Sequence, residues 1–157
     1  MATQNPIDQE GTYPLPEAQL DRFMFAINLE YPTFEEEVSV VKQTTSTHSS
    51  LVEVIFDAKA ILEFQSLIRR IPVADNVIEY AVGMISKTRP NTPAASEKIQ
   101  EFASWGAGPR ASQNLIFAAK THAVIHGKFS ADIEDVQGVS KSVLRHRIIK
   151  NYKAEAE

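Results

Sequence analysis

The sequence predicts a mainly α-helical fold that follows a short α/β remnant. Apolar residues recur at helical spacing from Thr33 onward, and proline or glycine interrupts that spacing at several points. One segment, residues 23–29, alternates apolar and other side chains as a β-strand does. We therefore expect the end of an α/β unit over residues 1–30 and an all-helical bundle over residues 31–157.

The composition is typical of a soluble globular protein. The chain has 157 residues, of which 43% are hydrophobic and 23% charged, with a net charge of -4. It has 0 cysteines, which excludes a disulfide framework or a thiolate metal site. No apolar run approaches the ~18 residues that a membrane span needs, and no leader pattern opens the chain. We expect a cytoplasmic location, no membrane partner, and no general attraction for nucleic acid.

The N-terminal thirty residues contain only fragments of regular structure. Asn5 precedes Pro6, which disfavours a helical conformation at its predecessor, and residues 17–21 are long enough only for a short helix. The segment FMFAINL then predicts a strand whose shared face carries Phe23, Phe25, Ile27 and Leu29. Because one strand cannot form a sheet, we expect most of a β-containing domain to lie upstream of Met1, or the chain to be part of a longer one.

Two helices are predicted before residue 72. Thr33 caps the first, whose first turn holds Glu35, Glu36 and Glu37 near the positive end of the helix dipole, so this acidic run indicates a helix start rather than a site. Residues 42–50 read as a loop and residues 51–56 as an extended run. Asp57 caps the second helix, which ends at Ile71-Pro72 and has an apolar side formed by Ile61, Phe64, Leu67 and Ile68.

Three further helices complete the predicted bundle. Asp75 caps one that ends at Arg89-Pro90, with Val77, Ile78, Ala81, Met84 and Ile85 facing inward. After a loop over residues 90–96, Pro109 takes a first-turn position of a long helix that Gly127 ends. Ser130 or Asp132 begins the last helix, which runs through Ile133, Val136 and Val139.

Most enzyme signatures are absent from the sequence. There is no glycine-rich phosphate loop with Lys and Ser or Thr, no acidic metal-binding strand and no cysteine nucleophile. His122 and His126 have the spacing of a zinc-binding pair on a helix, but the residues between them offer no general base and no third ligand stands out. We interpret them as polar residues of a partly exposed helix.

Three residues are candidates for polar chemistry. Arg110 follows Gly106-Ala107-Gly108-Pro109 at a helix start, where free backbone N–H groups and a guanidinium together favour an anion such as phosphate. Arg22 lies between a short helix and a strand, from which a planar cation can be presented outward. Asn5 places an amide in a turn. Each also has an ordinary interpretation, as a surface arginine or a turn asparagine.

Two separate stretches carry a family resemblance. ATQNP and LPEAQLDRF resemble the region from sensor 1 to the arginine finger in the MoxR family of AAA+ ATPases. WGAGPRASQNLIFAAKTHAVIHGK, followed by EDV and VLRHRI, resembles the lid domain of that family. The resemblance covers nearly the whole chain in the right order. It implies that residues 1–30 end the AAA+ core and that residues 31–157 form the helical lid.

The resemblance also implies roles and cofactors. Asn5 matches the sensor 1 asparagine that orients the attacking water, Arg22 the arginine finger that reaches a neighbouring subunit's nucleotide, and Arg110 the sensor 2 arginine. The cofactors would be ATP and Mg²⁺. Walker A, Walker B and the magnesium ligands would lie upstream, so this chain alone should not hydrolyse ATP. One departure is Gly108, where the family commonly has serine.

The implied partners are identical subunits in a ring of six and client proteins, often ones with von Willebrand factor A domains, that ATP hydrolysis remodels in a chaperone-like way. Two alternatives stay open. The chain could be a stand-alone helical interaction module with no nucleotide role. A kinship of these lids with those of replicative helicases would instead make DNA a partner, against which the net charge argues.

Overall fold

A computed structural model of the chain describes residues 1–3, 15–46 and 53–156. Asn5 lies outside these described residues. The chain divides into two compact units, one formed by Met1–Ala26 with Ile71–Glu157 and the other by Ile27–Arg70. The predicted domain boundary at residue 30 stays a prediction.

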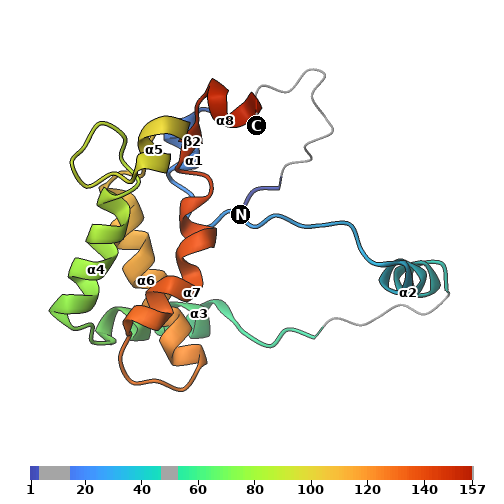
Figure 1. Ribbon diagram of the computed structural model, residues 1–157. Coiled ribbons are helices and arrows are strands. Elements are labelled where there is room, and N and C mark those ends of the chain that lie inside the picture. Colours follow the sequence, from blue (N-terminus) through green and yellow to red (C-terminus); the bar gives the residue numbers. More distant parts are fainter. Residues whose placement is uncertain (4–14, 47–52, 157) are drawn as a thin grey trace. The chain divides into compact units, whose positions relative to one another are not determined.

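Helices dominate the described residues, which confirms the mainly α fold class (Figure 1). The helices are α1 Glu17–Leu20, α2 Phe34–Thr44, α3 Ala58–Arg70, α4 Asp75–Ser86, α5 Glu97–Phe102, α6 Pro109–Ile125, α7 Ile133–Leu144 and α8 Tyr152–Ala156, and the strands are β1 Ala103–Trp105 and β2 Ile149–Lys150. None of the described helices is both long and apolar enough to cross a membrane.

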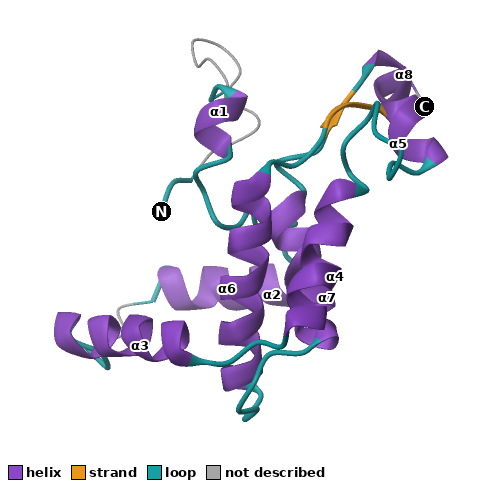
Figure 2. Cartoon of the chain, turned by 90° about the vertical axis from the view of Figure 1, so that its left-hand side faces the viewer, coloured by secondary structure: helices purple, strands orange, loops and turns teal. Residues whose placement is uncertain are grey.

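The core of the larger unit lies among α4, α6 and α7, which pack side by side (Figure 2). Helix α6 faces its neighbours largely with alanine, so the helix backbones approach closely and the larger side chains fill the remaining space. The buried residues of the three helices include Val77, Ala81 and Ile85 from α4, Ala111, Leu115, Ala118, Ala119 and Ala123 from α6, and Val136, Val143 and Leu144 from α7.

Several helix boundaries follow the predicted signals. Thr33 and Asp132 each form a capping box at the start of α2 and α7. Pro109 opens α6, and Gly127 follows its end with φ of 73°, a conformation that glycine adopts at little cost. The prediction that Asp75 caps α4 is wrong by one residue. Ala74 is the N-cap and makes no side-chain bond, and Asp75 is the first helical residue, where the dipole still favours its charge.

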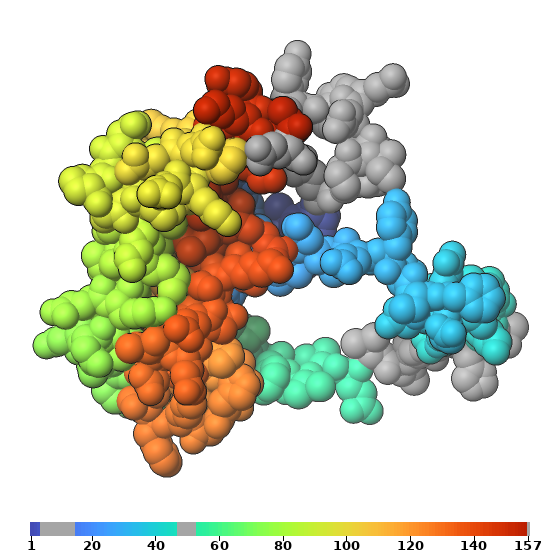
Figure 3. Space-filling view, in the orientation of Figure 1, coloured from blue at the N-terminus to red at the C-terminus, as the bar shows by residue number. Residues whose placement is uncertain are grey.

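A small sheet joins the C-terminal segment to the loop that leads into α6. Strands β1 and β2 are antiparallel, and the amide of Asn151 donates to the carbonyl of Phe102 at 3.0 Å. In Figure 3 the C-terminal residues, in red, pack against the α5 segment, in yellow. The sequence did not predict α5, β1 or β2, because segments of 6, 3 and 2 residues are too short to show a period.

The predicted strand over residues 23–29 is wrong. No residue of this segment is in a strand, and Phe23 and Phe25 are more than one-third exposed. Alternation shows only that two faces differ in polarity, whereas a strand also needs a neighbouring backbone to pair with. Among the described residues the segment makes two backbone bonds to helices, from the amide of Phe23 to the carbonyl of Leu20 in α1 at 3.0 Å and from the amide of Ala26 to the carbonyl of Ser142 in α7 at 2.9 Å.

The prediction of one bundle from Thr33 onward stays a prediction, because the structure divides this part of the chain between two units. Helices α2 and α3 belong to the smaller unit, and neither buries a residue. Both starts are nevertheless those predicted, since Asp57 accepts from the amide of Ala60 at 2.7 Å as Thr33 does from Glu36. The apolar side of α3 makes one ring contact, between Phe56 and Phe64 at 5.5 Å. Capping and periodicity predicted these helices, but neither signal specifies a packing partner.

Candidate functional site

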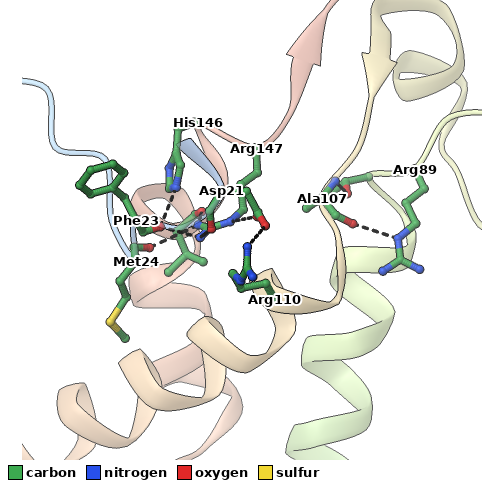
Figure 4. Close-up of polar contacts among 10 residues, drawn as sticks. Asp21, Phe23, Met24, Arg89, Ala107, Arg110, His146 and Arg147 are labelled. Carbon is green, nitrogen blue, oxygen red and sulfur yellow. Dashed lines mark hydrogen bonds and ion pairs between the residues drawn. The ribbon is translucent and has the colours of Figure 1, made fainter. Parts of the chain in front are cut away.

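The loop before α6 is held against the end of α4 by backbone contacts. A Cβ added at Gly106 would lie 2.2 Å from the carbonyl oxygen of Thr88, so only glycine fits there without movement. The amide of Ala107 donates to the Thr88 hydroxyl at 3.0 Å, and its carbonyl accepts from Arg89 Nε at 2.9 Å (Figure 4). Residue 107 therefore has a fixed place, and the start of α6 is fixed with it.

Arg110 lies in the first turn of α6 and reaches the residue that precedes Arg22. Its Nη1 donates to Asp21 Oδ2 at 2.9 Å (Figure 4). The Arg110 side chain is 50% exposed and that of Asp21 is 31% exposed. Solvent therefore screens this ion pair, which leaves Arg110 able to exchange Asp21 for another anion at little cost.

Arg147 approaches the same carboxylate from the buried side. Its side chain is 1% exposed, and its Nε donates to Asp21 Oδ1 at 2.9 Å. The rest of the guanidinium donates to main-chain carbonyls: those of Asp21 at 2.9 Å, Phe23 at 2.5 Å, Met24 at 3.3 Å and, within its own helical turn, Val143. A buried arginine is stable only when it is paired and its donors are satisfied, and both conditions are met here.

Arg22 lies within the segment that Arg147 holds, but its own side chain points to no partner. The amide of Arg22 donates to the carbonyl of Gln19 at 3.1 Å, and the amide of Phe23 to that of Leu20 at 3.0 Å, which forms a turn after α1. Arg22 is exposed, and its side chain makes no hydrogen bond or ion pair with the described part of the chain. The turn thus fixes the backbone and leaves the guanidinium available.

His146 adds another bond to this turn. Its Nε2 lies 3.0 Å from the carbonyl oxygen of Phe23, so the neutral ring donates from this nitrogen. Its Nδ1 is buried without a hydrogen-bond partner. Burial lowers the pKa of His146 below its ordinary value of 6.5; Arg147 lowers it further, while the Phe23 carbonyl and Asp21 act in the opposite direction.

The structure describes two of the three candidate residues that the sequence predicts. Arg22 and Arg110 lie near each other through Asp21, although their positions differ by 88 in the sequence, and Asn5 lies outside the described residues. Sequence reasoning missed Asp21 and Arg147. One signal for Arg147 was available, because it follows the buried Val143 by four residues, and a charge that continues an apolar face indicates a buried partner.

His122 belongs to a separate polar cluster between α6 and α7. Its Nδ1 lies 2.8 Å from Oδ1 of Asp135, a carboxylate with no exposed surface, which Lys128 also contacts at 3.2 Å. His126 stacks on His122 with ring centroids 4.1 Å apart. The described residues contain no group of three His, Cys, Asp or Glu side chains that could hold a metal ion. His122 therefore serves as a partner of a buried acid in this structure.

Comparisons with known proteins agree with this arrangement. Residues 96–157 match the AAA lid domain, and residues 1–25 match the ATPase family associated with various cellular activities (AAA). These two matches lie on the two parts of the chain that Asp21, Arg110 and Arg147 join. The C-terminal part of the chain thus matches an AAA lid domain, and its N-terminal part matches a segment of an AAA ATPase.

Whole-chain relatives specify the family further. Over 100% of its length the chain is 38% identical to "Chaperone MoxR1" of Mycobacterium tuberculosis and 34% identical to "Uncharacterized protein YeaC" of Bacillus subtilis. A crystal structure of a candidate ATPase from Cytophaga hutchinsonii matches 98% of the chain with a TM-score of 0.88 at 36% identity. The chain spans 41% and 47% of the two relatives and 47% of the crystallised chain. It belongs to the MoxR family of AAA+ ATPases.

Proposed function

We propose that this chain supplies nucleotide-contacting arginines to a MoxR-type AAA+ ATPase. Arg22 acts as the arginine finger at the nucleotide of a neighbouring subunit, and Arg110 acts as the sensor 2 arginine that reports nucleotide state to the lid. Both are guanidinium groups, which match the geometry of phosphate oxygens better than an ammonium does.

The observation that carries this proposal is the ion pair between Arg110 and Asp21 at 2.9 Å. It brings the start of α6 beside the turn that presents Arg22, so two cations from distant parts of the sequence occupy one neighbourhood. Phosphoryl transfer leaves a protein mainly positioning and charge stabilisation to provide, and an arginine finger supplies roughly a thousandfold or more in rate.

ATP and Mg²⁺ enter the proposal through family membership, since AAA+ ATPases use nucleotide and Mg²⁺ in general. Arg110 suits a phosphate because it lies at a helix start and is half exposed. Asn5 is proposed as the sensor 1 residue that orients the attacking water. The phosphate loop and the magnesium ligands are proposed to come from sequence other than these 157 residues.

The assembly of the whole protein and its client proteins are also proposed from family membership. We propose that the whole protein forms a ring, with six subunits as the family expectation, because the arginine finger proposed here acts in trans and so needs the nucleotide of a neighbouring subunit. A relative named as a chaperone supports remodelling of client proteins, and clients with von Willebrand factor A domains are the proposed class.

The test joins this chain to the part of Chaperone MoxR1 that precedes the matched region. In that chimera we expect Arg22→Ala to lower kcat about a thousandfold while the Kd for nucleotide changes less than about threefold. Arg145→Ala is the matched control, because Arg145 is a half-buried arginine that contacts neither Asp21 nor Arg110. An Arg22→Ala chimera that keeps the turnover of the control would remove Arg22 from the reaction.

Nucleotide binding separates this proposal from the interaction-module alternative. Fluorescent ATP is titrated into the 157-residue chain and into the chimera. The proposal expects binding by the chimera that Arg110→Ala weakens. Absence of binding by both would favour a helical module that acts through protein contacts alone.

A further inference from the structure

We infer that Arg147 is a positioning residue that holds the Arg22-bearing turn on the helical bundle, with Asp21 as the carboxylate that links this attachment to Arg110. The part of the inference that concerns turnover rests on the function proposed above. The attachment itself is a property of this chain and can be measured without nucleotide.

The first argument is where the donors of Arg147 go. Of the five hydrogen bonds that its guanidinium makes with described residues, four reach the turn: one to the Asp21 carboxylate and one each to the carbonyls of Asp21, Phe23 and Met24. Figure 4 shows Asp21, Phe23 and Met24 gathered around Arg147, and their carbonyls lie on both sides of residue 22 in the sequence. The guanidinium is rigid and planar, and it binds the main chain at residues 21, 23 and 24. It therefore fixes the backbone of residue 22 without contacting the side chain of that residue.

The second argument is the contrast between the two arginines at Asp21. The Arg147 side chain is 1% exposed, whereas the Arg110 side chain is 50% exposed. Breaking the buried pair would leave a desolvated cation without its partner, while the exposed pair can exchange with water or an anion. Arg147 is therefore the permanent partner of Asp21, and Arg110 is the exchangeable one.

The third argument is that apolar packing supports the turn only weakly. Met24 is the residue of the segment that packs against the core, and Ala26 gives the segment one main-chain bond to α7. Phe23 and Phe25 are more than one-third exposed. His146 adds one bond to the Phe23 carbonyl. Most of the attachment therefore depends on one guanidinium.

Together these contacts join the two nucleotide-contacting candidates in one rigid piece of the larger unit. A movement of α6 and α7 carries Arg110 directly and carries the Arg22 turn through Arg147. In the proposed ring, the lid of one subunit would then set both the sensor 2 contact and the arginine-finger contact.

The physical arm of the test uses the 157-residue chain. Arg147→Lys keeps the positive charge but replaces the planar guanidinium with a single ammonium group. Arg145→Lys is the matched control on the same turn. Hydrogen exchange is followed at the amides of Phe23 and Ala26, which donate to Leu20 and Ser142. We expect exchange at both to be about tenfold faster or more in Arg147→Lys, with far-UV circular dichroism and the control unchanged. Trypsin cleavage after Arg22 should accelerate in parallel.

A second variant keeps the physical arm decisive if Arg147→Lys does not fold. Asp21→Asn retains the shape of the side chain and removes the charge that both arginines share, with Glu17→Gln in α1 as its control. Folded Asp21→Asn protein in which Phe23 and Ala26 exchange within about twofold of the unaltered chain would overturn the inference.

The catalytic arm uses the chimera and asks whether Arg147 acts through Arg22. We expect Arg147→Lys to lower kcat about tenfold or more with little change in KM, and to have no further effect once Arg22 is alanine. Equal losses in both backgrounds would make Arg147 merely structural and would overturn the inference. If Arg22→Ala itself leaves turnover unchanged, the proposed function fails instead, and the exchange measurements still decide the attachment.

Discussion

The main chain at Gly106 passes so close to Thr88 that a Cβ at position 106 would lie 2.2 Å from the Thr88 carbonyl oxygen. The close approach puts the Thr88 hydroxyl within 3.0 Å of the Ala107 amide. Through these contacts the end of α4 sets the start of α6, and hence the place from which Arg110 extends.

Gly106→Ala is expected to destabilise the protein by about 1–3 kcal/mol, because main-chain atoms of Thr88 and Arg89 would have to move. Gly83→Ala in α4 is the matched control: nothing lies within 4 Å of its added Cβ, so we expect a gain of about 0.5–1 kcal/mol from helix propensity. Urea unfolding of both variants measures the difference. Equal effects of the two substitutions would contradict the close approach.

Gly108→Ser, which introduces the residue common in the family, is expected to stabilise the protein by a few tenths of a kcal/mol (about 0.3). Gly108 is the N-cap of α6 with φ of -82°, an extended conformation open to any residue, and its added Cβ would meet nothing within 4 Å. A serine there can accept from a free amide of the first turn. A lower urea midpoint for Gly108→Ser would show that the turn requires glycine.

The two arginines at Asp21 should differ in their contribution to stability. Arg147→Ala removes a buried pair and leaves three carbonyls of the turn without this donor, so we expect a loss of about 3 kcal/mol, near the low end for buried pairs because Asp21 is 31% exposed. Arg110→Ala breaks only the half-exposed pair and should cost about 0–1 kcal/mol. Thermal unfolding of the two variants under identical conditions provides the comparison, and similar losses would refute the distinction.

Asp135 should make the protein sensitive to strong acid. Burial raises the pKa of Asp135, but bonds from His122, the Asp132 amide and Lys128 together leave it below the ordinary 3.8. The ionised Asp135 carboxylate therefore stabilises the folded protein fully above pH 3.8. This stabilisation is lost as the pH falls from 3.8 through the lower folded-state pKa. We expect Asp135→Asn to cost about 1–3 kcal/mol near neutral pH, because the partners His122 and Lys128 are 33% and 38% exposed, and to cost progressively less in acid. Urea midpoints across this range, with the exposed Glu134→Gln as control, measure the trend.

His146 should contribute a second pH dependence, at milder acidity. Because burial holds the pKa of His146 below 6.5, the unfolded chain binds a proton first as the pH falls, and stability declines from about pH 6.5 down to the lower folded-state pKa. Asp21 and Arg147 carry the charges that face it. We expect His146→Gln to remove this decline from the urea midpoint measured between about pH 7.5 and 5. A decline of the same size in His146→Gln would assign it to other groups.

Local signals predicted local structure well. Thr33, Asp57, Pro109, Gly127 and Asp132 end or begin helices as expected, because capping and dihedral preferences act within a few residues. The predicted strand at 23–29 failed because it required a partner strand, which periodicity cannot supply. The short β1–β2 pair was not predictable for the related reason that its register pairs Ala103 with Lys150 and Trp105 with Ile149, residues far apart in the sequence.

The candidate site was predictable only in part. Arg110 stood out because a helix start and a guanidinium favour the same ligand, and Arg22 because it follows a short helix. Asp21 and Arg147 were missed because their pairing spans 126 residues and arises from tertiary packing alone. A charge four residues after the buried Val143, just beyond the end of α7, was the available clue.

A guanidinium at residue 147 does for the segment after α1 what an adjacent strand would otherwise do, since it satisfies carbonyls that a sheet would satisfy. A ladder spreads such bonds over many residues and tolerates the loss of any one of them. Here one residue, Arg147, makes all of these bonds. A single substitution at position 147 can therefore strengthen, weaken or remove the attachment without any change in the segment itself.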